Sequence, residues 1–221
     1  IMLSSYSVCR AMVMPASFLV VLFYAIYLVV RNGVISYQKA SGLAMFSGIV
    51  IFCFYSFILL KEMLPVGEYG YDAIFFILLI LCFAWGGDTC AYFAGRAFGK
   101  HKLCPVVSPK KTVEGAVGGV LGTMVFGVLV TVIYSIAADR MEEFTRSNIG
   151  VSMYVIIALL ACVAAVLGIY GDLFASVVKR QCGIKDYGTI FPGHGGILDR
   201  FDSVMFIAPF VTMVIIAVFY R

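Results

Sequence analysis

Long stretches without a charged residue dominate this sequence and restrict what it can fold into. Five stretches lack Asp, Glu, Lys and Arg, and a sixth carries one charge, Asp88. They are residues 11–30, 40–60, 73–95, 115–138, 147–171 and 203–220. Each is close to the ~20 residues that an α-helix needs to cross a bilayer. Because the runs are continuous and do not alternate with a period of two, they predict membrane-spanning helices.

The composition supports this interpretation. Hydrophobic residues make up 62% of the 221 residues, charged residues make up 13%, and the mean hydropathy is +1.03. A soluble domain is roughly 45–50% apolar and about 25% charged. These values exclude a disordered chain, a secreted disulfide scaffold and an ordinary cytosolic enzyme. We predict an all-α, polytopic membrane protein with about six transmembrane helices, forming one integral membrane domain over residues 1–221.

Basic residues are distributed unevenly between the loops. Loops 31–39, 96–114 and 179–202 contain 11 of the 16 Lys and Arg residues, whereas loops 61–72 and 139–146 contain three. By the positive-inside rule, the three basic loops face the cytoplasm. The sequence therefore predicts that the polar strings within loops 96–114 and 179–202 lie on the cytoplasmic side.

Two carboxylates lie where hydropathy predicts lipid. Asp88 follows Trp85-Gly86-Gly87 inside the third span, and Asp172 ends the fifth span. An intramembrane carboxylate costs on the order of 2.5–3.5 kcal/mol, so it normally faces a polar cavity. Either both residues reach water at the helix ends, or they belong to a functional site; for Asp172 the neighbouring motif favours the site.

That motif runs from Gly171 to Ser203. Asp172, Ser176 and Lys179 share one helical face at i, i+4 and i+7. A Gly-rich turn follows, and then Asp199 and Asp202 stand three residues apart with Arg200 between them. Carboxylates at two helix ends beside a basic, Gly-rich loop are typical of a magnesium-phosphate site.

A second polar string, residues 95–115, lies between two spans. Pro109 interrupts a helix and Ser108 is positioned to cap the next one, while Lys110 and Lys111 place positive charge at the membrane surface. The lysines would suit either an anchor on lipid headgroups or a phosphate site at a helix start. Four glycines follow at GxxxG spacing, a pattern typical of helix packing; they are Gly115, Gly118, Gly119 and Gly122.

Together these strings resemble the phosphatidate cytidylyltransferase family, also called CDP-diacylglycerol synthases. The family's signature is approximately S-x-x-K-R-x4-K-D-x-G-x3-P-G-H-G-G-x-x-D-R-x-D, matched here from Ser176 to Asp202, and two upstream strings match at residues 85–100 and 108–115. The resemblance covers residues 73–221, which we expect to be the catalytic region, with N-terminal helices in residues 1–72. It implies an integral membrane enzyme with a polar cleft that faces the cytoplasm. The implied reaction transfers CMP from CTP to phosphatidate in phospholipid biosynthesis at the bacterial inner membrane, and the implied cofactor is Mg²⁺, alone or with a second cation.

The resemblance also implies roles for matching residues. The metal ligands would be Asp172 and Asp199, and the catalytic residues would further include Lys179, Arg200 and Asp202. The substrate-binding residues would be Asp88, Ser108, Lys110, Lys111, Arg180, Lys185, Gly193, His194, Gly195 and Gly196. The implied partners are CTP, phosphatidate, the lipid bilayer and a second copy of the chain, and no nucleic acid.

The sequence departs from the family pattern at one informative position. The family usually has Glu in its G-D-L-x-E-S string, and Ala175 stands there in this chain. Bacterial members also commonly have further N-terminal spans. We expect this chain to have one to three helices fewer than those members. Three alternatives stay open: a related CTP-dependent enzyme acting on another lipid, of the polyprenol kinase or CDP-archaeol synthase type; a catalytically impaired membrane scaffold; and a transporter.

Overall fold

The computed structural model describes residues 5–30, 36–140, 150–189 and 195–219 and is predominantly helical. Its elements in chain order are α1 (Ser5–Val30), α2 (Tyr37–Met63), α3 (Val66–Tyr69), α4 (Asp72–Phe98), β1 (Lys102–Cys104), β2 (Ser108–Thr112), α5 (Val113–Arg140), α6 (Val151–Gln181), the 3-10 turn η1 (Leu198–Arg200) and α7 (Val204–Phe219). Each of the six predicted spans overlaps one long helix. The prediction of an all-α polytopic membrane protein is confirmed.

Within the described residues, four helices are long and apolar enough to cross a membrane: α2, α4, α5 and α6. The apolar stretch of α7, Val204–Val218, is shorter, and the stretch Phe18–Val30 of α1 is also apolar. The structure therefore supports four full spans and leaves the count of six as a prediction. Two short strands, β1 and β2, pair antiparallel between α4 and α5, an element that the all-helical expectation did not contain.

The chain divides into two compact units, residues 1–52 and 53–221. In the first unit, α1 and α2 are linked by a hydrogen bond in which the Tyr24 hydroxyl donates to Ser47 Oγ over 3.0 Å. The second unit contains the end of α2 and all later elements, and it holds every residue of the pocket described below. The single domain over residues 1–221 stays a prediction.

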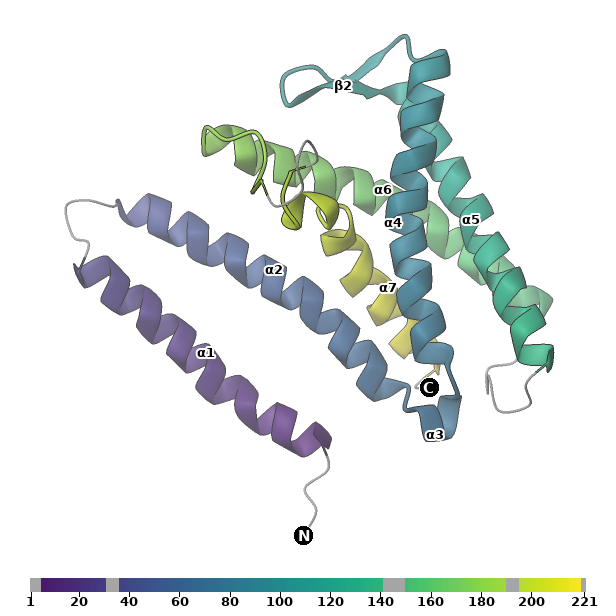
Figure 1. Ribbon diagram of the computed structural model, residues 1–221, viewed down its shortest axis with the longest axis horizontal. Coiled ribbons are helices and arrows are strands. Elements are labelled where there is room, and N and C mark those ends of the chain that lie inside the picture. The colour runs from purple at the N-terminus through teal and green to yellow at the C-terminus, as the bar shows by residue number, and fades with distance from the viewer. Residues whose placement is uncertain (1–4, 31–35, 141–149, 190–194, 220–221) are drawn as a thin grey trace. The chain divides into compact units, whose positions relative to one another are not determined.

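The core of the second unit lies among α4, α5, α6 and α7 (Figure 1). Its most enclosed side chains are large and apolar, including Leu79, Ile80, Phe83, Ile157 and Val211, each at most 1% exposed. On α5, by contrast, Val117, Leu121, Val125 and Leu129 recur every four residues and are 49–67% exposed. Such a stripe is suited to lipid, where no hydrophobic penalty attaches to an apolar surface.

The contact between α4 and α5 depends on glycine. An added Cβ at Gly118 would collide with the Cβ of Ala94, and one at Gly122 would collide with Cys90. Gly115 and Gly119 face Ala91 in the same way. The prediction that these four glycines form a helix-packing face is confirmed, and because α4 covers this face, it is already occupied within the chain.

We expect Gly118→Val to lower the free energy of unfolding by about 1–3 kcal/mol, because the added side chain overpacks the α4–α5 contact. Titration of the purified protein with SDS in mixed micelles measures this quantity. Gly48→Val is the matched control, since an added Cβ there meets nothing within 4 Å. Equal losses in the two variants would contradict the close α4–α5 packing.

Candidate functional site

A pocket of about 450 Å³ lies where α4 ends and α5 begins, beside α6 and the turn that precedes α7. This volume is within the range of small-molecule sites, about 300–1,000 Å³. Its lining gathers both kinds of charge: Asp88, Asp172, Asp199 and Asp202 with Arg96, Lys110 and Lys111. The fold thus brings the two polar strings of the sequence into one site.

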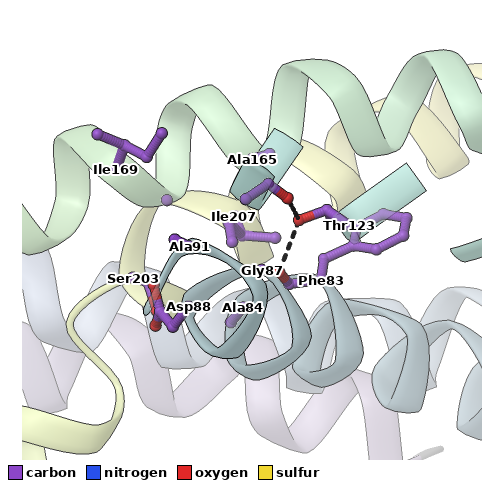
Figure 2. Close-up of a pocket in the computed structure, with 12 residues that line it drawn as sticks. Phe83, Ala84, Gly87, Asp88, Ala91, Thr123, Ala165, Ile169, Ser203 and Ile207 are labelled. Carbon is purple, nitrogen blue, oxygen red and sulfur yellow. Dashed lines mark hydrogen bonds between the residues drawn. The ribbon is translucent and has the colours of Figure 1, made fainter. Parts of the chain in front are cut away.

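Asp88 enters the pocket from α4 at a point of close helix approach. A Cβ at the preceding Gly87 would lie 2.5 Å from Thr123 Oγ1 of α5, so only glycine fits there. The Ser203 hydroxyl donates a hydrogen bond of 3.1 Å to Asp88 Oδ2. Figure 2 shows this pair among the residues that line a small cavity. The cavity has a volume of about 20 Å³, enough for one water molecule. The carboxylate therefore joins α4 to the turn that carries Asp202.

Asp172 lies in the C-terminal half of α6 and forms an ion pair with Lys111 of β2. Both side chains are about one quarter exposed. The Ser176 hydroxyl, one turn further along α6, donates to Asp172 Oδ1 over 3.3 Å. This ion pair holds the strand hairpin against α6, so each of the two motifs supplies one partner.

Lys179 is the most enclosed cation of the site and joins two carboxylates. Its Nζ lies 2.8 Å from Asp199 Oδ1 and 3.9 Å from Asp202 Oδ2. The Lys179 side chain is 11% exposed and that of Asp199 is 8% exposed. At this burial, the loss of either partner leaves an uncompensated charge. The ammonium thus fixes the turn before α7 to the end of α6.

Backbone donors complete the surroundings of Asp199. The N–H groups of Tyr187 and Gly196 donate to Asp199 Oδ2 over 2.8 and 2.9 Å. Gly195 has φ +83°, a left-handed conformation that favours glycine and lets the chain turn closely over this carboxylate. Burial works to raise the pKa of Asp199, but the hydrogen bonds from Lys179, Gly196 and Tyr187 outweigh it and hold the pKa below its usual value.

For Asp202, the influences that raise the pKa outweigh those that lower it. Burial and the negative charge of Asp172 raise the pKa of Asp202 to about 7, against the lowering influence of Lys179 and the Ser203 N–H. Asp88 adds a smaller raising contribution. The pocket therefore has a surplus of negative charge around Asp88, Asp172 and Asp202, which a bound cation would relieve.

The hairpin is held to α5 by Glu114. The Glu114 carboxylate accepts hydrogen bonds from the backbone N–H groups of Lys100 and His101, and Nδ1 of His101 lies 2.6 Å from Oε1. The expectation that Ser108 caps the following helix is wrong, because residues 108–112 form a strand and α5 begins at Val113. Thr112 takes that role, and its hydroxyl accepts from the Gly115 N–H over 3.1 Å.

The structure does not bring all the expected site residues into the pocket. Six of them line it: Asp88, Lys110, Lys111, Asp172, Asp199 and Asp202. Seven others lie elsewhere in the described structure: Ser108, Lys179, Arg180, Lys185, Gly195, Gly196 and Arg200. Of these, Lys179 and Gly196 act through Asp199, whereas Arg180 and Lys185 are exposed. Gly193 and His194 lie outside the described residues.

Several residues at the site were not among the candidates from the sequence. Tyr92, Arg96, Leu103 and Thr112 line the pocket. Trp85 donates its indole N–H to the Arg200 carbonyl over 3.0 Å, which ties α4 to η1. Arg96 and Trp85 lay inside the matched strings, but their roles depend on contacts with distant segments that spacing alone does not reveal.

Ala175 is fully buried and does not line the pocket. Its carbonyl accepts a hydrogen bond of 3.1 Å from the Tyr187 hydroxyl, on the same side of α6 as Lys179. The four aspartates of the pocket come from other positions. The acidic character of the pocket therefore does not depend on a carboxylate at position 175.

The donor set fits a magnesium ion with substrate phosphates. Within the described ranges, no three His, Cys, Asp or Glu side chains gather into a metal shell. Magnesium does not need one, since it is usually held by one or two carboxylates together with waters and phosphate oxygens. Asp172 and Asp199 line the same pocket and would offer oxygen ligands. Beyond the contacts described, Asp172 retains a lone pair on each carboxylate oxygen and Asp199 retains one on Oδ1.

Fold and pocket together define an integral membrane protein with an acidic and basic pocket at one end of a helical bundle. The chain belongs to the cytidylyltransferase family, whose sequence profile it matches over residues 1–218. It is similar to the phosphatidate cytidylyltransferase of Bacillus subtilis (strain 168), with 32% identity over 198 residues, 90% of this chain and 66% of that protein.

Staphylococcal proteins of the same name are also similar. That of Staphylococcus saprophyticus is 40% identical over 147 residues, and that of Staphylococcus epidermidis (strain ATCC 12228) is 42% identical over 145. Each alignment covers 66% of this chain, and 51% and 50% of the respective relative. The chain therefore spans between half and two thirds of the length of these relatives.

Removal of the Lys179 charge is expected to destabilise the protein. We expect Lys179→Met to lower the free energy of unfolding by about 3–5 kcal/mol, because Asp199 would lose its buried partner. The double variant Lys179→Met/Asp199→Asn should lose less, since the unpaired charge of Asp199 is also removed. SDS titration measures both.

Lys61→Met is the control for this comparison, because Lys61 is exposed and forms no part of the pocket. It should change the free energy of unfolding by no more than about 0.5 kcal/mol. A double variant less stable than Lys179→Met would contradict the assignment of Lys179 as the partner of Asp199.

Proposed function

We propose that this chain transfers CMP from CTP to phosphatidate, giving CDP-diacylglycerol and pyrophosphate in phospholipid biosynthesis. A phosphate oxygen of phosphatidate attacks the α-phosphorus of CTP. The new P–O bond forms as the bond to the bridging oxygen of the β-phosphate breaks, and pyrophosphate leaves. The attacking oxygen is already anionic, so the reaction needs no strong general base. The support is family membership together with the names of the relatives.

The observation that carries the proposal is the charge arrangement of the pocket. Arg96, Lys110 and Lys111 line it on the side of α4 and the hairpin, and four aspartates line it from α4, α6 and the turn before α7. Cationic groups positioned at phosphate oxygens offset the charge that moves during phosphoryl transfer. The arrangement suits two phosphorylated substrates that bind next to each other beside the four aspartates.

We assign Mg²⁺ to Asp172 and Asp199, with Asp88 and Asp202 beside them in the same pocket. A bound magnesium ion would polarise phosphate oxygens and neutralise charge on the leaving pyrophosphate. The surplus of carboxylates leaves room for a second cation. Lys111, which pairs with Asp172 in the structure, becomes available to a substrate phosphate when a cation neutralises that carboxylate.

Lys179 has a positioning role in this proposal. It lies outside the pocket lining and holds Asp199 and Asp202 in place. Phosphate neutralisation is assigned instead to Arg96, Lys110 and Lys111, which face the pocket. The diacyl tails of phosphatidate stay in the bilayer while the headgroup reaches these residues.

The site is proposed to face the cytoplasm, at the inner membrane of a bacterium. The pocket is built from two of the basic loops, since Arg96, Lys110 and Lys111 belong to residues 96–114 and Asp199 and Asp202 belong to residues 179–202. Both loops fall on the cytoplasmic side under the positive-inside rule. A cytoplasmic pocket has direct access to CTP.

Activity is tested with radiolabelled CTP and phosphatidate in detergent, with and without Mg²⁺. We expect label in the lipid phase only when Mg²⁺ is present. We expect the rate to fall by about 100-fold or more in Asp172→Asn, because the site would lose a proposed ligand of the magnesium ion that offsets the phosphate charge. Asp139→Asn is the matched control. Asp139 is exposed in the last turn of α5 and lies outside the pocket, so this variant should keep the parent rate.

Label incorporated without Mg²⁺, or unchanged in Asp172→Asn, would contradict the proposed site. A folded chain that incorporates label into polyprenol or an ether lipid, but not into phosphatidate products, would favour the alternative lipid substrate. CTP binding without turnover would favour the scaffold.

Ala175→Glu is expected to destabilise the protein without raising its activity. Position 175 is fully buried, so the new carboxylate would overpack the α6 interface and lose its hydration. We expect the free energy of unfolding, measured by SDS titration, to fall by more than about 1 kcal/mol. Ala175→Ser is the comparison variant, because it adds a polar group at position 175 with little added volume. A silent parent that Ala175→Glu makes active would instead identify position 175 as the missing ligand.

A further inference from the structure

The strand hairpin carries exposed apolar and basic residues that the proposed reaction does not use. Val106, at the tip between β1 and β2, is 93% exposed, the highest exposure among the large apolar side chains described. Pro105 beside it is also exposed. Lys100 and Lys102 are exposed and do not line the pocket. An exposed apolar tip flanked by lysines resembles neither a packed core element nor a simple solvated turn.

The helices on either side of the hairpin place it at a particular depth. α4 has 27 residues and α5 has 28, which correspond to about 40 Å at 1.5 Å per residue. A bilayer is about 40–45 Å thick with its headgroups and about 30 Å without them. Both helices therefore end at the headgroup layer. Figure 1 shows the hairpin projecting sideways from these ends and not continuing along the helix axes.

Aromatic residues mark the same layer. Tyr92, Phe93 and Phe98, in the last two turns of α4, are 60%, 63% and 71% exposed. Tyr and Trp side chains gather at the boundary between hydrocarbon and headgroups, and Tyr92 is placed accordingly. Their position at the base of the hairpin agrees with the depth given by helix length.

The charge of this segment complements an anionic lipid surface. Residues 96–113 contain five Lys or Arg residues and no Asp or Glu. The next carboxylate, Glu114, is engaged with the backbone of Lys100 and His101. Basic clusters at the membrane surface attract anionic headgroups, and the attraction is carried by individual Lys and Arg residues.

We propose that the β1–β2 hairpin is an interfacial anchor, in which the Val106 tip inserts between headgroups and Lys100 and Lys102 bind the phosphates of anionic phospholipids. The anchor fixes the hairpin wall of the pocket, formed by Leu103, Lys110 and Lys111, at the level of lipid phosphates. This surface is distinct from the pocket and is defined by Lys100, Lys102, Pro105 and Val106.

The first test measures lipid contact and does not depend on activity. The photocrosslinker p-benzoylphenylalanine replaces Val106, and the protein is reconstituted in vesicles of phosphatidylcholine alone or with phosphatidylglycerol. We expect phospholipid adducts at position 106, detected by mass spectrometry, with phosphatidylglycerol enriched over its share of the bilayer. The control places the crosslinker at Asp186, which is exposed beyond the end of α6. Equal adduct yields at 106 and 186 would overturn the proposal.

The lysines are tested in the same assay. Lys100→Gln and Lys102→Gln should each reduce the phosphatidylglycerol enrichment by up to about fivefold, the factor expected for one Lys at a charged lipid surface. Lys61→Gln, at an exposed position outside the hairpin, should not change it. Unchanged enrichment in Lys100→Gln/Lys102→Gln would overturn the electrostatic part of the proposal.

A third arm separates bulk lipid from the proposed substrate. Vesicles that contain phosphatidate in place of phosphatidylglycerol present the same headgroup chemistry. Adducts with both lipids support an anchor on anionic lipid in general. Adducts with phosphatidate alone would overturn the anchor and assign the hairpin to substrate binding, and neither outcome depends on whether the chain turns over CTP.

Discussion

The ammonium of Lys179 lies between Asp199 and Asp202, and the pocket end of the molecule depends on this contact. A charge that is removed from water needs a partner, and here the partners come from segments 20 and more residues apart. Lys111 with Asp172 and Ser203 with Asp88 satisfy the same requirement across other pairs of elements. The polar contacts thus determine how the hairpin, α4, α6 and the turn before α7 come together.

The apolar part of the fold was largely predictable, because it follows from local patterns. Uninterrupted apolar runs indicated the helices, and the glycine spacing from Gly115 to Gly122 indicated the face that packs on α4. The hairpin was missed because residues 108–112 read as a polar helix start, whereas their strand pairing depends on residues 102–104. Local spacing contains no information about that partner.

The candidate site was predictable in composition but not in role. The aspartates that the motifs indicated do line one pocket, as do Lys110 and Lys111. Lys179 was expected to neutralise phosphate, yet its ammonium is directed at Asp199, and Arg96 faces the pocket instead. A lysine beside carboxylates pairs with whichever lies nearest in three dimensions, and that distance is set by the loop after α6, whose path the sequence does not specify.

The length of α6 links the site to bilayer thickness. Its uncharged part, residues 151–171, is about 31 Å long, close to the hydrocarbon core, and the segment from Asp172 to Gln181 extends about 15 Å further. Asp172 therefore marks the water-facing border of the hydrocarbon, with Lys179 about 10 Å above it. A thicker bilayer would draw the Asp172–Lys111 pair into hydrocarbon, and a thinner one would leave apolar residues below it in contact with headgroups. A mismatch between α6 and the bilayer thickness therefore changes the surroundings of this ion pair before those of the other pocket residues. Lipid chain length would in this way alter the charge of the pocket.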